Sequence, residues 1–281
     1  MTQLSEAPAS GVTKPVGTLG RGAAPRGPWV ETKTAKVLLP TLAITGFIIL
    51  WEISVRSGLV NGTVVPPASD VGISLVRLSQ ESFFWGATWI TVQETLYGFA
   101  LGTTVAWLLG TAIGISRAFS LAFYPLVVAF QIMPRVALAP VFLTWFGFGL
   151  TSKVVMAAVI CFFPVLIGVI VGLNNVDKDA LTLMRSFGAS KWDTYRRLSL
   201  PSSLPVIFAG IKTAMTLALI GAIVAEFVGA SVGMGVLVKT FNFTLQVADG
   251  FAVIVALSAV GLALYAFTEY VEHKLVFWRG R

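Results

Sequence analysis

The chain has 281 residues, of which 56% are hydrophobic and only 12% are charged, and its mean hydropathy is +0.84. A soluble domain carries roughly a quarter charged residues, so this composition excludes an ordinary soluble protein and indicates an integral membrane protein. The formal net charge of +7 does not indicate nucleic-acid binding, because the basic residues lie between apolar segments and form no separate basic domain.

The sequence offers little for catalysis or metal binding. It contains one cysteine, Cys161, within an apolar run, and one histidine, His273, near the C-terminus. A disulfide within the chain and a Cys/His metal cluster are therefore excluded. We expect no enzyme activity and no cofactor in this chain.

The first 34 residues are rich in Gly, Pro, Ser, Thr and Ala and have almost no large apolar side chain. Such a segment cannot bury enough apolar surface to offset the entropy of ordering. It also lacks the short apolar core and cleavage site of a signal peptide. The sequence therefore predicts a disordered cytoplasmic tail over residues 1–34, followed by a membrane domain over residues 35–281.

The membrane domain contains six apolar segments long enough to span a bilayer, which takes about 20 residues of helix. They cover about 36–56, 92–116, 121–147, 153–173, 205–228 and 250–271. The sequence thus predicts an all-α membrane protein of about six transmembrane helices.

The connecting loops give the orientation, because loops on the cytoplasmic side carry an excess of Lys and Arg. If both termini are cytoplasmic, the basic residues on that side, apart from the long tail, are Arg117, Lys178, Arg185, Lys191, Arg196, Arg197, Lys274, Arg279 and Arg281. The opposite side then has only Arg56, Arg77, Lys153 and Lys239. We therefore predict cytoplasmic N- and C-termini.

Two of the segments have special patterns. The second carries glycines at 98, 102, 110 and 114, a spacing that lets helix backbones approach closely. The third contains Pro134, Arg135 and Pro140, which predict a kink. Irregular backbone at membrane depth occurs where it lines a cavity or is buried in protein, so this segment is either a wall of a transport pathway, with Arg135 bound to a carbonyl or carboxylate, or a bent helix without a role in passage.

The cytoplasmic loop over residues 174–204 is the largest internal loop, and it is patterned. Ala180, Met184 and Phe187 form one apolar stripe of a short helix, and Gly188 follows where that helix is expected to stop. Ser190 is then predicted to cap a second short helix.

The second short helix carries Trp192, Tyr195 and Leu198 on one face, and we expect Pro201 to end it, with Pro205 in the first turn of the fifth span. Aromatic residues and arginine are enriched in protein interfaces. The pattern alone leaves two interpretations open, a docking site for a partner protein or an interfacial helix lying on anionic lipid.

The loop resembles the cytoplasmic signature of ABC importer permeases, in which Glu-Ala-Ala is followed by three residues, Gly, nine residues, Ile, one residue and Leu-Pro. Gly188, Leu198 and Leu200-Pro201 match the second half of this pattern with its complete spacing. The first half departs from it, because residues 182–184 are Thr-Leu-Met, which puts one polar docking contact in doubt.

Four further segments are similar to the same family, over about residues 40–275: QIMPRVALAPVFLTWFGFG (131–149), FFPVLIGVIVGL (162–173), LPSSLPVIFAGIK (200–212) and GAIVAEFVGASVGMGVL (221–237). They resemble the branch of permeases for nitrate, sulfonate, taurine and thiamine-precursor pyrimidines. The segments RSFGASKW and IGAIVAEFVG resemble the pyrimidine-precursor and riboflavin-type members more closely than the sulfonate members.

The resemblance implies a type I ABC importer permease in a bacterial inner membrane, with the 174–204 loop as the coupling loop. Its expected partners are a second copy of the chain, two ATP-binding cassette subunits that bind ATP and Mg²⁺, an extracytoplasmic solute-binding protein, and membrane lipid. The residues expected to dock the ATPase are Met184, Arg185, Phe187, Gly188, Ala189, Trp192, Tyr195, Arg196, Leu200 and Pro201.

Glu226 is the most informative charge within the spans, because ionisable residues in membranes are costly and mark candidate functional sites. Near the outer end of the fifth span, it is either a gate or pathway residue, together with Pro134 and Arg135, or an interfacial carboxylate satisfied by water or an arginine. The alternative function is an ion-gradient-driven secondary transporter or channel. That class favours paired ionisable residues at mid-membrane and an inverted repeat, and the sequence shows neither clearly.

Overall fold

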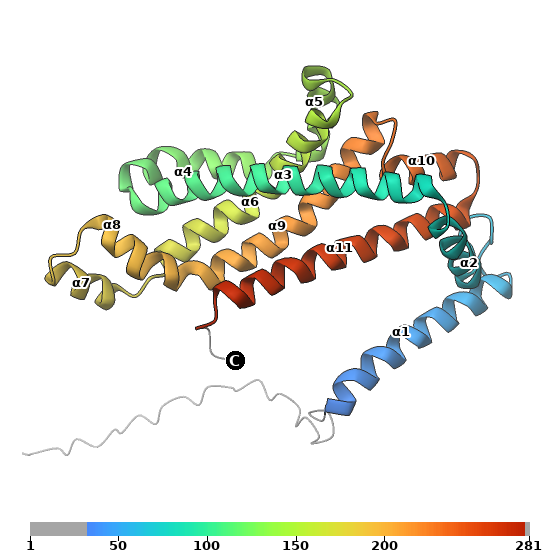
Figure 1. Ribbon diagram of the computed structural model, residues 1–281, viewed down its shortest axis with the longest axis horizontal. Helices are drawn as coiled ribbons and strands as arrows, with labels where there is room; N and C mark the ends of the chain where they lie inside the picture. The colour runs from blue at the N-terminus through green and yellow to red at the C-terminus, as the bar shows by residue number, and fades with distance from the viewer. Residues whose placement is uncertain (1–32, 279–281) are drawn as a thin grey trace, which may run out of the picture. The chain divides into compact units, whose positions relative to one another are not determined.

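The computed structural model describes residues 33–278, and within this range every regular element is a helix (Figure 1). The chain divides into two units, Met1–Leu50 and Trp51–Arg281, and helix α1 (Lys33–Arg56) passes from the first to the second. Residues 1–32 of the predicted tail lie outside the described residues.

The second unit holds the other helices. They are α2 (Ala68–Ser79), α3 (Ser82–Ile115), α4 (Arg117–Ile132), the 3-10 helix η2 (Arg135–Leu138), α5 (Ala139–Phe146), α6 (Leu150–Asn174), α7 (Lys178–Ser186), α8 (Lys191–Thr194), the π-helix η3 (Tyr195–Ser199), α9 (Leu200–Gly229), α10 (Met234–Phe243) and α11 (Val247–Leu275).

Five helical segments of the described chain are long and apolar enough to cross a membrane, and the bent pair formed by α4 and η2–α5 makes a sixth if its two arms form one span. The two arms of this pair are bent by 86°. The prediction of six spans with an irregular third one is thus confirmed.

The short helices α2 and α10 were not predicted, because a search for spans of about 20 residues passes over helices of 12 and 10 residues. Helix α3 begins at Ser82, ten residues before the expected start of the second span, and at 34 residues it is longer than a bilayer requires. In Figure 1, α2 and α10 lie at the opposite end of the second unit from α7 and α8.

Helix α6 is at the centre of the second unit and packs against α3 and α9. Its side chains Met156, Cys161 and Val165 are completely buried. The burial of Cys161 agrees with its place in an apolar run of the sequence. The core therefore consists of one nearly enclosed helix between two long neighbours.

Glycines make the close contact of α3 with α6, as their spacing predicted. A Cβ atom on Gly102 would lie 2.6 Å from the carbonyl oxygen of Ala158 and 2.6 Å from the Sγ atom of Cys161. A Cβ atom on Gly98 would likewise collide with the Cβ atom of Ala157 and lie 2.9 Å from the carbonyl oxygen of Val154. Because real side chains do not approach this closely, only glycine allows the two backbones to pack here.

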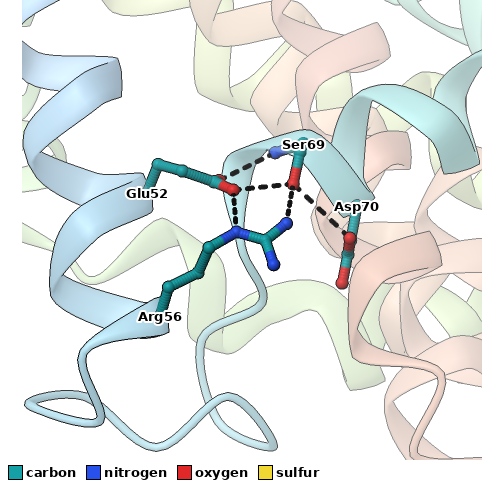
Figure 2. Close-up of polar contacts among 4 residues, drawn as sticks. All are labelled: Glu52, Arg56, Ser69 and Asp70. Carbon is teal, nitrogen blue, oxygen red and sulfur yellow. Dashed lines mark hydrogen bonds and ion pairs between the residues drawn. The ribbon is translucent and has the colours of Figure 1, made fainter.

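The N-terminus of α2 is bound by a carboxylate from another helix (Figure 2). Glu52 near the end of α1 accepts a hydrogen bond from the backbone N–H of Ser69 at 3.1 Å and one from its hydroxyl at 2.9 Å. Arg56 donates to Glu52 at 2.5 Å and to the Ser69 hydroxyl at 3.0 Å. Since α2 has no side-chain cap of its own, Glu52 satisfies a donor that the helix start leaves open.

Two further ion pairs join the helices of the second unit. Lys212 of α9 contacts Glu272 of α11 at 2.6 Å, with both side chains largely buried. Arg77 of α2 pairs with Asp249 at the start of α11. These pairs compensate charges that would otherwise be costly among apolar helices.

Candidate functional site

The 174–204 loop folds as two short helices around a glycine turn, as predicted. The last turn of α7 is closed by two backbone hydrogen bonds, from Gly188 N–H to the Arg185 carbonyl at 2.9 Å and from Ala189 N–H to the Met184 carbonyl at 3.1 Å. Gly188 has a φ of +75°, the left-handed conformation that such a helix end requires. The left-handed conformation at this turn explains why glycine suits position 188.

Ser190 caps α8, which confirms the capping prediction. Its hydroxyl accepts from the backbone N–H of Asp193 at 3.1 Å and lies 2.5 Å from a carboxylate oxygen of the same residue. The cap fixes the direction in which α8 leaves the glycine turn.

The end of the second short helix differs from the prediction. Helix α8 does not stop at Pro201 but continues through the π turn Tyr195–Ser199 into α9, so the segment is helical from Lys191 to Gly229. The N–H of Leu200 bonds to the Tyr195 carbonyl, five residues earlier. Pro201 lacks the N–H that a regular helix would use next, and the wider turn accommodates it without a break in the chain direction.

The residues expected to dock an ATPase divide into two groups. Arg185, Phe187, Gly188, Trp192 and Arg196 are exposed, with Phe187 and Trp192 at 79% and 65% of their full accessible surface. Met184, Ala189, Leu200 and Pro201 are half-buried. The first group can contact a partner, and the second supports it.

Tyr195 is buried, at 7% exposure, and therefore cannot belong to the contact surface of the loop. Its hydroxyl lies 3.5 Å from the Thr111 hydroxyl of α3, and its ring stacks on Trp192 at a centroid distance of 5.4 Å. Tyr195 thus joins the exposed aromatic side chain of the loop to the membrane helices.

A groove of about 450 Å³ lies beside the bend between α4 and η2, against α6 and α9. Pro134 is the residue that precedes η2, and Arg135 lines the groove. The Arg135 guanidinium donates to the carbonyl of Ile160 at 3.3 Å and to that of Gln131 at 3.4 Å, so the predicted contact with a carbonyl is confirmed.

Glu226 lies at the far end of the second unit from the loop, and it is completely buried. It accepts from the Thr91 hydroxyl at 2.6 Å and from the backbone N–H of Gly235 at 2.5 Å. The Thr91 hydroxyl in turn accepts from the N–H of Met234 at 2.9 Å. The expectation of an interfacial carboxylate bound to water or arginine is therefore wrong, because Glu226 and Thr91 together satisfy the first N–H groups of α10.

The backbone at the start of α10 fits this carboxylate closely. Gly233 has a φ of +141°, and a Cβ atom built there would collide with the Glu226 carboxyl group. A Cβ atom on Gly235 would lie 2.7 Å from the same group. Both glycines are therefore required for α10 to approach α9.

Glu94 was not recognised from the sequence. It lies on α3 one turn after Thr91, is 2% exposed, and its Oε2 atom has no hydrogen-bond partner among the described residues. Its carboxyl group interacts with the carboxyl group of Glu226. The ammonium group of Lys153 interacts electrostatically with both carboxyl groups. Its position near the start of the expected span resembled that of an interfacial residue, and only the tertiary structure brings it next to Glu226.

The chain contains a family domain over residues 98–277, the binding-protein-dependent transport system inner membrane component. The chain belongs to the binding-protein-dependent transport permeases. The matched region includes the 174–204 loop, the groove and Glu226.

Full-length relatives of this permease are named as transport permeases. The chain is 32% identical to the formylaminopyrimidine transport permease protein ThiX of Halalkalibacterium halodurans, over 89% of this chain and 99% of that protein. It is also 32% identical to the riboflavin transport system permease protein RibX of Chloroflexus aurantiacus, over 83% of this chain and 87% of that protein.

The fold of the permease is that of a type I ABC importer. An inward-facing structure of the MetNI methionine ABC transporter matches it with a TM-score of 0.62, over 69% of this chain and 96% of that chain, at 16% sequence identity. The family match and the apolar helices together make the chain a multi-pass inner membrane permease.

Proposed function

We propose that two copies of this permease form the membrane part of an importer that receives a small organic or anionic solute from an extracytoplasmic binding protein. Two ATP-binding cassette subunits bind ATP and Mg²⁺ and dock on the 174–204 loops. The permease itself hydrolyses nothing, and its N- and C-termini are cytoplasmic. The solute class, pyrimidine-precursor or riboflavin-like against sulfonate-, nitrate- or taurine-like, is set largely by the binding protein.

The observation that carries this proposal is the arrangement of the loop. The exposed side chains of Arg185, Phe187, Trp192 and Arg196 stand on two capped helices. Exposed aromatic and arginine side chains on a well-ordered support are the composition of a protein interface.

The continuous helix from α8 to α9 supports transmission of the motion. A displacement of α8 reaches α9 without passing through a flexible connection, and Tyr195 links the same segment to α3. In this proposal, Pro134 and Arg135 border the pathway. Glu226 holds α10 on α3 and α9, and it acts on the outer gate by that contact.

Copurification tests the docking. The permease is tagged and expressed with its ATPase, and Trp192→Ala with Arg196→Ala is compared with Lys178→Ala and Asp179→Ala at the exposed start of α7. Because a few central aromatic and arginine residues dominate interfaces, we expect the first pair to reduce the bound ATPase at least about tenfold and the control pair to leave it unchanged. Full copurification of the first pair would exclude this docking surface.

Dependence on the ATPase separates the proposal from an ion-gradient-driven transporter. Uptake is measured in cells with the ATPase gene deleted and again after an active or a hydrolysis-deficient ATPase is restored. We expect uptake only with the active subunit. Uptake that persists without it, and that an ionophore abolishes, would support the secondary transporter instead.

A further inference from the structure

The groove beside the bend of α4 and η2 lies half-way along the spanning helices α6 and α9. It is lined by Phe163 and Ile167, half-way along α6, and by Thr213, half-way along α9. Its floor is the close crossing of α6 and α9, where a Cβ atom on Gly210 would lie 2.5 Å from the carbonyl oxygen of Pro164. Most of the lining is apolar, and the polar side chains are those of Gln131, Arg135 and Thr213.

Arg135 is held in this groove by two carbonyl groups that have lost their helical partners. The carbonyl of Ile160 would normally accept from the N–H four residues later, but that residue is Pro164, which has none. The carbonyl of Gln131 lies in the last turn of α4. The guanidinium also lies over the ring of Phe163, at 4.6 Å from its centroid.

These contacts fix the position of the guanidinium but do not neutralise it. The two carbonyl oxygens are neutral and occupy only part of the five N–H donors of the guanidinium, and the ring of Phe163 is neutral too. The guanidinium therefore keeps its full positive charge. Among residues 33–278, no carboxylate lies within 4.0 Å of Arg135. Lys212 on the neighbouring helix α9, by contrast, has Glu272 as a counter-ion.

An uncompensated cation in an apolar environment is costly unless an anion joins it. A guanidinium binds planar and tetrahedral oxyanions through paired N–H groups, and the aromatic and aliphatic walls suit an apolar body. We propose that this groove is a transit site for a small organic anion, with its carboxylate or sulfonate on Arg135 and its apolar part against Phe163 and Ile167. This inference rests on the proposed function, because it requires the groove to be part of the pathway.

The single cysteine of the chain makes a direct test practical. In a Cys161→Ala background, Thr213→Cys introduces a thiol on the groove wall of the complete complex in lipid nanodiscs. Its reaction rate is measured with a sulfonate-bearing and a trimethylammonium-bearing methanethiosulfonate reagent, in the presence and absence of ATP. The reference is Ser258→Cys, which lines a separate apolar groove between α9 and α11.

We expect the sulfonate reagent to be favoured at Thr213→Cys. Arg135→Gln should lower the ratio of anionic to cationic rates about tenfold, and Arg135→Lys should largely restore it, while the ratio at Ser258→Cys stays constant. A ratio that Arg135→Gln changes by less than about twofold overturns the inference, although the pathway proposal would survive. If neither reagent modifies Thr213→Cys with or without ATP, the groove is not a water-accessible pathway, and both proposals fail.

A protection experiment needs no change at Arg135 and remains decisive if the Arg135 variants do not fold. Methanesulfonate and its uncharged analogue dimethyl sulfone are compared as competitors for the modification of Thr213→Cys by the sulfonate reagent. We expect methanesulfonate at millimolar concentration to slow the reaction severalfold and dimethyl sulfone to have no effect. Equal protection by both compounds, or by neither, contradicts an oxyanion site.

Discussion

The carboxylate of Glu226 on α9 accepts a hydrogen bond from the backbone N–H of Gly235 in the first turn of α10. Glu52 does the same for Ser69 in the first turn of α2. Neither short helix has a side-chain cap of its own. A carboxyl group from a spanning helix thus accepts a hydrogen bond from an N–H group that each of these helix starts leaves open.

Thr91 is the second support of α10, and its removal can be compared with that of a close neighbour. Thr91→Val leaves the buried N–H of Met234 without its acceptor and removes one of the donors to Glu226, so we expect it to lower the free energy of unfolding by about 1–3 kcal/mol. Thr95→Val is the control, because Thr95 is equally buried but bonds only to a carbonyl of its own helix. Thermal unfolding in one detergent measures both. Equal midpoints for the two variants would contradict the capping role.

The glycines of α3 allow a second comparison within one helix. Gly102→Ala places a Cβ atom 2.6 Å from an α6 carbonyl oxygen and should destabilise the permease by about 1–3 kcal/mol. Gly86→Ala meets nothing within 4 Å and should stabilise it by up to about 1 kcal/mol, because alanine favours helix. Thermal unfolding in one detergent compares the two variants. If Gly102→Ala stabilised the protein, α3 and α6 would pack less closely than described.

Gly188 tests the conformation of the coupling loop. A Cβ atom there meets nothing within 4 Å, so only the positive φ opposes a side chain. We expect Gly188→Val to reduce transport-coupled ATP hydrolysis strongly, and Gly188→Asn to reduce it much less, because asparagine tolerates the left-handed conformation better. Expression and thermal midpoint serve as controls. Indistinguishable Val and Asn variants would contradict a conformational cause.

The Lys212–Glu272 pair should show strong coupling between α9 and α11. Lys212→Met removes the ammonium group that contacts the mostly buried carboxylate of Glu272 and should cost about 1–4 kcal/mol of unfolding free energy. The double variant Lys212→Met/Glu272→Gln removes both charges and should recover much of this loss. A double-mutant cycle on thermal or denaturant unfolding gives the coupling energy, and additive effects would mean that the ion pair contributes nothing.

The sequence predicted the features that depend on local pattern. The apolar runs predicted the spans, and the spacing of Gly98 and Gly102 predicted a close helix contact without naming its partner helix. Gly188 and Ser190 predicted the end of α7 and the start of α8. Each of these rests on periodicity or on turn and cap chemistry within a few residues.

The features that were missed depend on contacts distant in the sequence. The proximity of Glu94 to Glu226 joins two helices 132 residues apart in numbering, and no local pattern reports it. The burial of Tyr195 likewise depends on Thr111 of α3. Pro201 indicated a helix end, but the chain continues because the preceding turn widens.

That wider turn determines how α8 and α9 are rotated relative to each other. A π turn takes up one residue more than an α turn, which amounts to about 100° of rotation around the helix axis. The exposed side of α8, with Trp192, is therefore held at a fixed rotation angle relative to the exposed and buried sides of α9. A chain one residue shorter between Tyr195 and Ser199 would retain both helices but change the rotation of α8 relative to α9. A displacement of the loop would then act on a different side of α9.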